Sequence, residues 1–128
     1  MHPNERLLRD EYSARARRDD QLLSETFSED IVWHVPGRSA ISGVYRGRDE
    51  VMQYVQRRRE LADDTFDISV EDVLANDNHG LVIASGRVTR NGRAFEWRAH
   101  GLYRFEGGAI AECWVLPEDQ ALFDEIWA

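Results

Sequence analysis

The second half of the chain changes from helical spacing to strict alternation, and this change constrains the fold more than any other feature. Between residues 66 and 71 every even position is apolar and every odd position is polar. A period of two is typical of a strand that buries one face and exposes the other. The chain from Thr65 onward is therefore predicted to form a sheet rather than further helices.

Three turn signals divide this half into strands. Residues 76–80 are rich in Asn, Asp and Gly, Asn91-Gly92 is a strong signal for a two-residue hairpin, and residues 106–108 end in two glycines. The strands are predicted near 65–75, 81–90, 93–105 and 109–116. Because strands of this length twist, we expect a strongly curved antiparallel meander.

The first half of the chain has helical spacing. Pro3 suits a first helical turn, and Leu7, Leu8 and Tyr12 follow at the spacing of one helix face. The other predicted elements are a short helix capped by Asp19 or Asp20, an apolar strand within 31–37, a turn at 43–47, a helix at 48–62 and a last helix starting at Pro117. The helices supply apolar faces that fill the curved sheet.

Length, charge and cysteine content limit the class of protein. The 128 residues suit a single domain over 1–128, and the net charge of −8 argues against nucleic acid or an anionic membrane as partner. A small neutral or cationic ligand suits this overall balance better. The only cysteine, Cys113, permits no internal disulfide and is expected to be a buried, inert thiol. With no signal-peptide pattern near the amino terminus, we expect a cytoplasmic protein.

His34 stands alone in an otherwise apolar strand, between Trp33 and Val35. An imidazole has two ring nitrogens to satisfy, so we expect this one either in a pocket or in a buried structural hydrogen bond. The four histidines, at 2, 34, 79 and 100, share no ligand spacing, so we expect no metal and no cofactor.

The strand predicted at 93–105 has two different faces. Trp97, Gly101 and Tyr103 lie on its apolar face, which we expect to point inward, with the aromatic rings lining a pocket or simply filling the core. Arg98 and His100 lie on the other face, at a dimer interface or in ion pairs, unless a strand bulge turns them into the pocket.

Three motifs give the chain a family resemblance: 27–37 (FSEDIVWHVPG), 43–51 (GVYRGRDEV) and 103–114 (YRFEGGAIAECW). The chain resembles the NTF2-like superfamily, specifically its SnoaL-like branch, which is related to ketosteroid isomerases and polyketide cyclases. The resemblance implies an α+β cone, with a curved four-strand meander and a short strand wrapped around three helices and a short C-terminal helix. It also implies one pocket for a small apolar or aromatic molecule, and a homodimer formed through the sheet.

The resemblance also suggests roles for single residues. His34 takes the place of the general-base carboxylate of the related isomerases, and Tyr12 matches a tyrosine that polarises the substrate oxygen. The second oxygen-polarising group of those isomerases, an acid, falls on Gly101 and is missing here. The residues expected to hold the ligand are Tyr45, Trp97, Tyr103 and Trp114.

Two hypotheses of different class follow. In the first, the protein is a cofactor-independent isomerase, cyclase or hydratase in which His34 moves a proton. In the second, it is a ligand-binding or dimeric scaffold protein with the same cone, and His34 is a structural residue. The missing acid favours the second hypothesis modestly.

Overall fold

The alternating half of the chain forms the expected meander in the computed structural model, which describes residues 1–128. Its antiparallel strands are β3 (Asp67–Ala75), β4 (His79–Arg90), β5 (Arg93–Glu106) and β6 (Ala109–Pro117). Asn91 and Gly92 have φ values of 52° and 78°, as a tight turn between β4 and β5 requires. The prediction of a four-strand meander is confirmed.

Two further strands extend the sheet beyond the meander. β1 (Phe27–Val35) lies parallel to β6, and β2 (Gly43–Arg46) pairs antiparallel with β1, so that the strand order is β2-β1-β6-β5-β4-β3. The turn expected at 43–47 is therefore a short edge strand. It forms because β1 would otherwise leave a row of backbone groups unpaired along that edge.

Four helices accompany the sheet, close to their expected positions. They are α1 (Pro3–Arg17), α2 (Asp20–Glu25), α3 (Gly47–Leu61) and α4 (Gln120–Ile126). Of the two expected caps, Asp19 and Asp20, it is Asp19 that caps α2, because its carboxylate accepts a hydrogen bond from the Leu22 N–H. The last helix begins three residues beyond Pro117 because Asp119 caps it in the same way, through the Leu122 N–H. None of the helices is long and apolar enough to cross a membrane.

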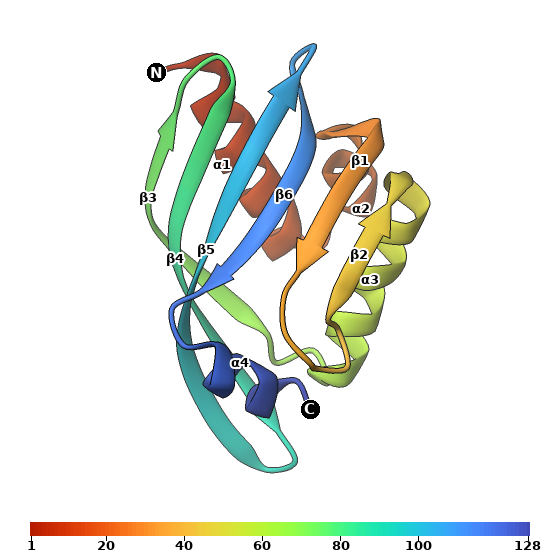
Figure 1. Ribbon diagram of the computed structural model, residues 1–128, viewed down its shortest axis with the longest axis vertical. Helices are drawn as coiled ribbons and strands as arrows, with labels where there is room; N and C mark the ends of the chain where they lie inside the picture. The colour runs from red at the N-terminus through yellow and green to blue at the C-terminus, as the bar shows by residue number, and fades with distance from the viewer.

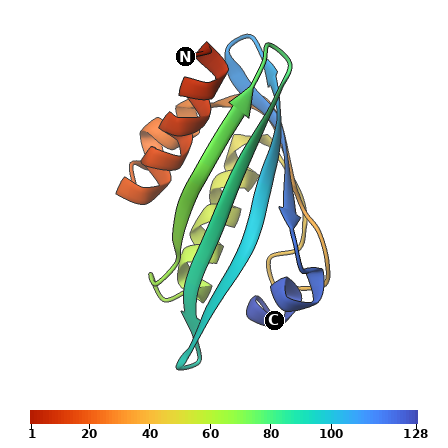
Figure 2. The same ribbon diagram turned by 90° about the vertical axis from the view of Figure 1, so that its left-hand side faces the viewer.

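The sheet and helices form a cone-like α+β arrangement. Helices α1, α2 and α3 lie behind the sheet in Figure 1, and the turned view in Figure 2 shows the sheet bending along its length. Helix α4 lies at the opposite end of the molecule from the amino terminus (Figure 1) and contacts β5. We call the sheet surface toward α1 and α3 the inner face and the opposite surface the outer face. A single cluster of 25 buried residues fills the space on the inner face.

Candidate functional site

A cavity lies between the inner face of the sheet and the helices. The space between its atoms is about 520 Å³, part of which is open to solvent. The lining is mainly aromatic and includes Trp33, Tyr54, Phe66, Trp97, Tyr103 and Trp127. Four of these rings come from the buried sides of β1, α3 and β5, while Phe66 directly precedes β3 and Trp127 directly follows α4. The cavity is thus suited to a flat, mostly apolar molecule.

Two tyrosine hydroxyls meet at one side of the cavity. Tyr12 of α1 and Tyr103 of β5 are 7 % and 1 % exposed, and their hydroxyl oxygens lie 2.6 Å apart. Burial raises the pKa of both phenols above the ordinary value of 10, so both stay protonated at neutral pH. Two hydroxyls carry two protons and their mutual hydrogen bond uses one, so one proton remains to be donated.

A buried ion pair supports the hydroxyl pair. Arg15 Nη2 lies 2.6 Å from Glu11 Oε1 and donates a longer hydrogen bond, of 3.3 Å, to the Tyr103 hydroxyl. Its guanidinium also lies 4.3 Å from the centre of the Tyr12 ring. Burial raises the pKa of the Glu11 carboxyl, although Arg15 acts to lower it. The positive end of this pair therefore faces the phenols, where it favours negative charge on a nearby oxygen.

A second arginine reaches the cavity from α3. Arg58 is 6 % exposed, and its Nη1 donates to the Tyr54 hydroxyl at 3.2 Å. Its Nε has no hydrogen-bond partner. The indole N–H groups of Trp33 and Trp127 are likewise buried without partners. The unpartnered polar groups that line the cavity are therefore all donors.

Three of the predicted site residues meet in the cavity. Tyr12, Trp97 and Tyr103 all line it, and Trp97 and Tyr103 lie on the inner face as alternation along β5 predicts. Gly101 lines it as well, between these two rings in the sequence. A Cβ atom at Gly101 would lie 2.6 Å from Tyr103 Cε2, so the glycine makes room for the tyrosine ring.

His34 does not lie in the cavity, and the expectation that its ring points inward is wrong. Along β1 the buried residues are Ile31, Trp33 and Val35, so alternation places His34 on the outer face. Its Nε2 donates to Glu112 Oε2 at 2.6 Å, and its ring stacks on Trp114 with 5.3 Å between ring centres. The imidazole is a surface-facing, hydrogen-bonded group rather than a base beside a ligand.

Two predicted ligand-binding residues also lie outside the cavity. Trp114 alternates with Cys113 along β6 and belongs to the outer face, next to His34. Tyr45 packs its ring against Tyr54, with 4.8 Å between ring centres, and donates to the Ile41 carbonyl at 2.6 Å. The inward position in β6 is taken by Cys113, which is buried as expected, and burial raises the pKa of its thiol.

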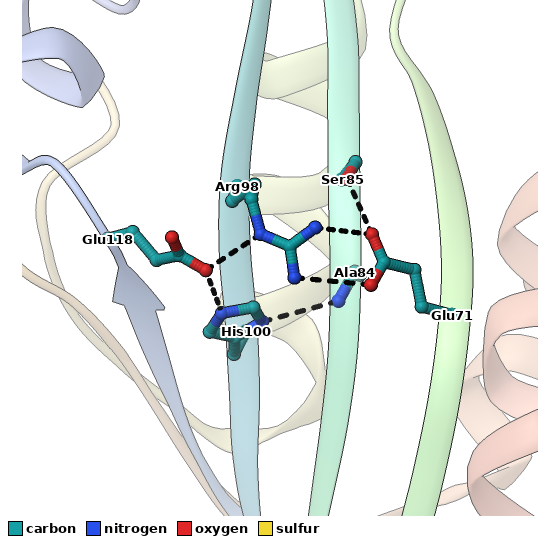
Figure 3. Close-up of polar contacts among 6 residues, drawn as sticks. All are labelled: Glu71, Ala84, Ser85, Arg98, His100 and Glu118. Atoms are coloured by element: carbon teal, nitrogen blue, oxygen red, sulfur yellow. Dashed lines mark hydrogen bonds and ion pairs between the residues drawn. The ribbon is translucent and has the colours of Figure 1, made fainter.

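Arg98 of β5 lies on the outer face, where it links β3 to the segment that follows β6 (Figure 3). Its guanidinium pairs with Glu71 of β3 and donates to Glu118 Oε2, beyond β6, at 2.8 Å. Hydrogen bonds from Arg98 hold the pKa of both carboxyls below the ordinary value of 4.5. Of the alternatives expected for this face, the structure shows ion pairs.

His100 belongs to the same outer cluster but also borders the cavity. Its Nε2 donates to Glu118 Oε2 at 2.6 Å, and its Nδ1 accepts the Ala84 N–H at 3.3 Å (Figure 3). The ladder between β4 and β5 has no pair at this point, and the imidazole takes up the free backbone donor. Both ring nitrogens are engaged, so His100 has no lone pair free for a ligand.

Sequence reasoning missed several lining residues, and the pattern contained a signal for most of them. Arg58 follows Val51, Tyr54 and Val55 at helical spacing, which puts it on the buried stripe of α3. Trp33 follows from the same alternation that excludes His34. No group of three or more His, Cys, Asp or Glu side chains is gathered for a metal ion.

Comparison with known proteins places the chain among relatives of the same fold. The uncharacterized protein Rv0034 of Mycobacterium tuberculosis is 32% identical over 123 residues, which cover 95% of this chain and 94% of the relative. The structure of Bal32a from a soil-derived mobile gene cassette has a TM-score of 0.94 at 27% identity, covering 98% of this chain and 97% of that one. A Xanthomonas campestris protein with a cystatin-like fold has a TM-score of 0.91 at 26% identity, covering 100% of this chain and 99% of that one.

The family model for the SnoaL-like domain matches residues 8–113. This segment contains Tyr12, Arg58 and Tyr103 of the cavity. It also contains the full length of five helices and strands whose residues line the cavity. The cone, the curved sheet and the sequence match agree, and the chain belongs to the SnoaL-like domain family, with an NTF2-like fold.

Proposed function

We propose that this protein, with residues 1–128 as one domain, binds a small aromatic molecule in the cavity of its cone. The observation that carries the proposal is the buried hydroxyl pair of Tyr12 and Tyr103, 2.6 Å apart, at the side of an otherwise aromatic cavity. Rings hold a flat ligand by burial and edge contacts, and one well-placed donor fixes its orientation. The hydroxyl proton left over by the pair would be donated to an oxygen of the ligand.

Base catalysis by a histidine is not part of this proposal. His34 lies on the outer face, and the two ring nitrogens of His100 are occupied by Glu118 and Ala84. A general base needs a free lone pair within hydrogen-bonding reach of the proton that it removes. Binding is therefore the function that the arrangement of side chains supports best.

Binding is tested with neutral 2-naphthamide, which has a flat ring system and one carbonyl acceptor. The indole N–H signals in a ¹H–¹⁵N spectrum report on position, because Trp33, Trp97 and Trp127 line the cavity while Trp114 lies outside it. We expect the first three signals to shift and that of Trp114 to stay. Tyr103→Phe is expected to weaken binding roughly threefold to tenfold, the contribution of one neutral hydrogen bond.

His34→Gln is the matched control for this experiment. It changes a polar ring on the outer face and should leave the dissociation constant of 2-naphthamide unchanged. Titration of the Trp114 indole alone, or loss of binding in His34→Gln but not in Tyr103→Phe, would place the ligand on the outer face and end the proposal.

A second candidate function is acid-assisted chemistry on a carbonyl compound. The specific observation is Arg15, which donates to Tyr103 and so supports a donor that would stabilise negative charge growing on a carbonyl oxygen. In such a reaction solvent removes a proton from the carbon next to the carbonyl group, and the hydroxyl pair stabilises the enolate oxygen. Isomerases and cyclases that use no cofactor need this type of stabilisation.

Enolisation can be measured directly with 2-tetralone in deuterated water. The protein should speed exchange of the hydrogens on the carbon next to the carbonyl, and Tyr103→Phe should remove most of that acceleration. Exchange at the rate of buffer alone, with bound ketone visible in the indole spectrum, would leave binding as the function and exclude this chemistry.

We also propose that the outer face pairs with a second copy of the chain. A shallow groove there is lined by Val44, Trp114 and Leu116, beside His34. Val44 and Leu116 are 48% and 41% exposed, which is unusual for large apolar side chains that lie together. A symmetric partner would cover this groove with the same residues of its own sheet.

A further inference from the structure

Arg58 is the one buried arginine of the cavity without a carboxylate partner. Its guanidinium lies 4.6 Å from the centre of the Phe66 ring and 5.2 Å from that of Tyr54, and its only hydrogen bond goes to the Tyr54 hydroxyl. Its Nε is buried and unbonded. A guanidinium stays charged in a protein, so this is a charge on the cavity wall with no carboxylate in contact with it. Glu11 is near enough for Arg58 to help lower its pKa, but it forms its ion pair with Arg15.

Three other arginines in this part of the molecule are paired with carboxylates. Arg15 pairs with Glu11 at 2.6 Å, and Arg18 pairs with Asp64 at 3.0 Å. Arg59, the next residue after Arg58, pairs with Asp20 at 2.8 Å. A buried charge without a counter-charge is costly, and such a group is retained where an outside partner completes it.

The other unpartnered groups of the cavity point to the same kind of partner. The Trp33 and Trp127 indoles are buried donors that lack acceptors. The one buried acceptor without a partner, Glu11 Oε2, belongs to a residue outside the cavity lining. A ligand that pairs with these donors must therefore carry acceptor oxygens. The oxygen that lies beside Arg58 should be negatively charged.

A second hollow adjoins the cavity and has the same local charge. The two share Arg15, Arg58 and Phe66, and the hollow adds Arg18 and Arg59. Of its four arginines, three have carboxylate partners, namely Glu11, Asp64 and Asp20. Arg58 alone has none, so although the overall charge of −8 favoured a neutral or cationic ligand, the unpaired Arg58 favours an anion.

We propose that the ligand of the cavity is an aromatic anion whose carboxylate or other oxyanion pairs with Arg58. This inference rests on the proposed function, because it names the class of molecule that the same cavity binds. The ring system lies among the aromatic side chains, and the anionic oxygen accepts hydrogen bonds from the Arg58 guanidinium.

The test compares two probes of nearly the same shape, 2-naphthoate and neutral 2-naphthamide, by calorimetry and by the indole signals of Trp33 and Trp127. The wild-type protein should bind the carboxylate about tenfold to a hundredfold more tightly, as expected for a charge-assisted hydrogen bond. Arg58→Met should abolish this preference, and Arg58→Lys should keep part of it.

Arg57→Met is the matched control, since Arg57 is the adjacent arginine of α3 but is exposed and outside the cavity lining. It should keep the full preference for the carboxylate. Equal affinity of the wild-type protein for the two probes would overturn the charge inference and leave the binding function standing, whether or not the Arg58 variants fold. If neither probe shifts the indoles of the cavity, both proposals fail together.

Discussion

The two faces of the sheet consist of alternate residues of the same strands, yet their polar groups are treated in opposite ways. On the outer face Arg98 engages Glu71 and Glu118, and His34 engages Glu112. Toward the inner face Arg58 Nε and the Trp33 indole are buried without partners. The outer face completes its own hydrogen bonds, whereas the inner face leaves donors unpaired, and the proposed ligand would accept hydrogen bonds from them.

This difference is the reverse of what the free-energy cost of burying polar groups would lead us to expect. An exposed ion pair contributes little because water competes for both charges, while an unpartnered buried donor costs free energy. Most buried polar groups in proteins have partners, and the proposed binding function would account for the exceptions gathered in one cavity. The difference between the faces therefore supports that proposal more strongly than the identity of any single residue does.

The strongest test of the comparison uses two adjacent residues of β1. Trp33→Ala should lower the free energy of unfolding by about 3–5 kcal/mol, because it removes a large ring from a packed core. His34→Ala should cost only about 1 kcal/mol or less, since its ion pair with Glu112 is partly exposed. Chemical denaturation of both variants measures the difference, and similar losses would show that the faces are not distinct.

A smaller effect is expected where the inner face makes room for Tyr103. Gly101→Ala places a Cβ atom 2.6 Å from the tyrosine ring and 2.7 Å from its hydroxyl oxygen, so the ring must shift. We expect a loss of about 1–3 kcal/mol in the free energy of unfolding, as for other overpacked cores. The shift should also break the hydroxyl pair and weaken 2-naphthamide binding, and an unchanged melting temperature together with unchanged affinity would contradict this account.

The outer groove gives a third prediction, through the proposed homodimer. Leu116→Lys should weaken dimerisation by about tenfold or more, because two lysines would be buried per symmetric interface. Leu74→Lys is the control, since Leu74 is also exposed but lies on β3, at the far edge of the sheet. Analytical ultracentrifugation measures both, and a wild-type protein that remains monomeric at high concentration would refute the dimer.

The smallest effect is expected from the exposed cluster around Arg98. Because Arg98 lowers the pKa of Glu71 and Glu118, the two carboxylates stabilise the fold fully above pH 4.5. That stabilisation is lost as the pH falls below 4.5 through the lowered pKa values. A ¹³C titration of the carboxyl groups should show both pKa values return toward 4.5 in Arg98→Met. Unchanged pKa values would mean that Arg98 does not pair with Glu71 and Glu118 in solution.

Much of the fold followed from local rules in the sequence. The alternation after Thr65 and the Asn91-Gly92 turn specified the meander, and the Asp19-Asp20 pair marked the start of α2 to within one residue. The edge strand β2 was missed because a four-residue segment that begins with a glycine and is followed by another is too short to show a period of its own. Its pairing depends on the exposed edge of β1, which is a tertiary feature.

The site was less predictable, and His34 shows why. Its apolar neighbours suggested a pocket, but alternation in β1 buries Trp33 and turns the next residue outward. The same rule, applied along β5, placed Trp97 and Tyr103 correctly. Arg58 was overlooked because a charged residue on an apolar stripe is usually at the boundary of the stripe, and only packing shows that this one lies inside.

The parallel pairing of β1 with β6 has a consequence for how the molecule is made. Glu112 meets His34 across this pairing although 78 residues separate them in the chain. Contacts between such distant segments form late and slowly, because the chain must lose the entropy of closing a long loop before the contacts can stabilise it. During synthesis the cavity would thus stay open on one side until residues 109–128, which contain β6 and α4, have left the ribosome.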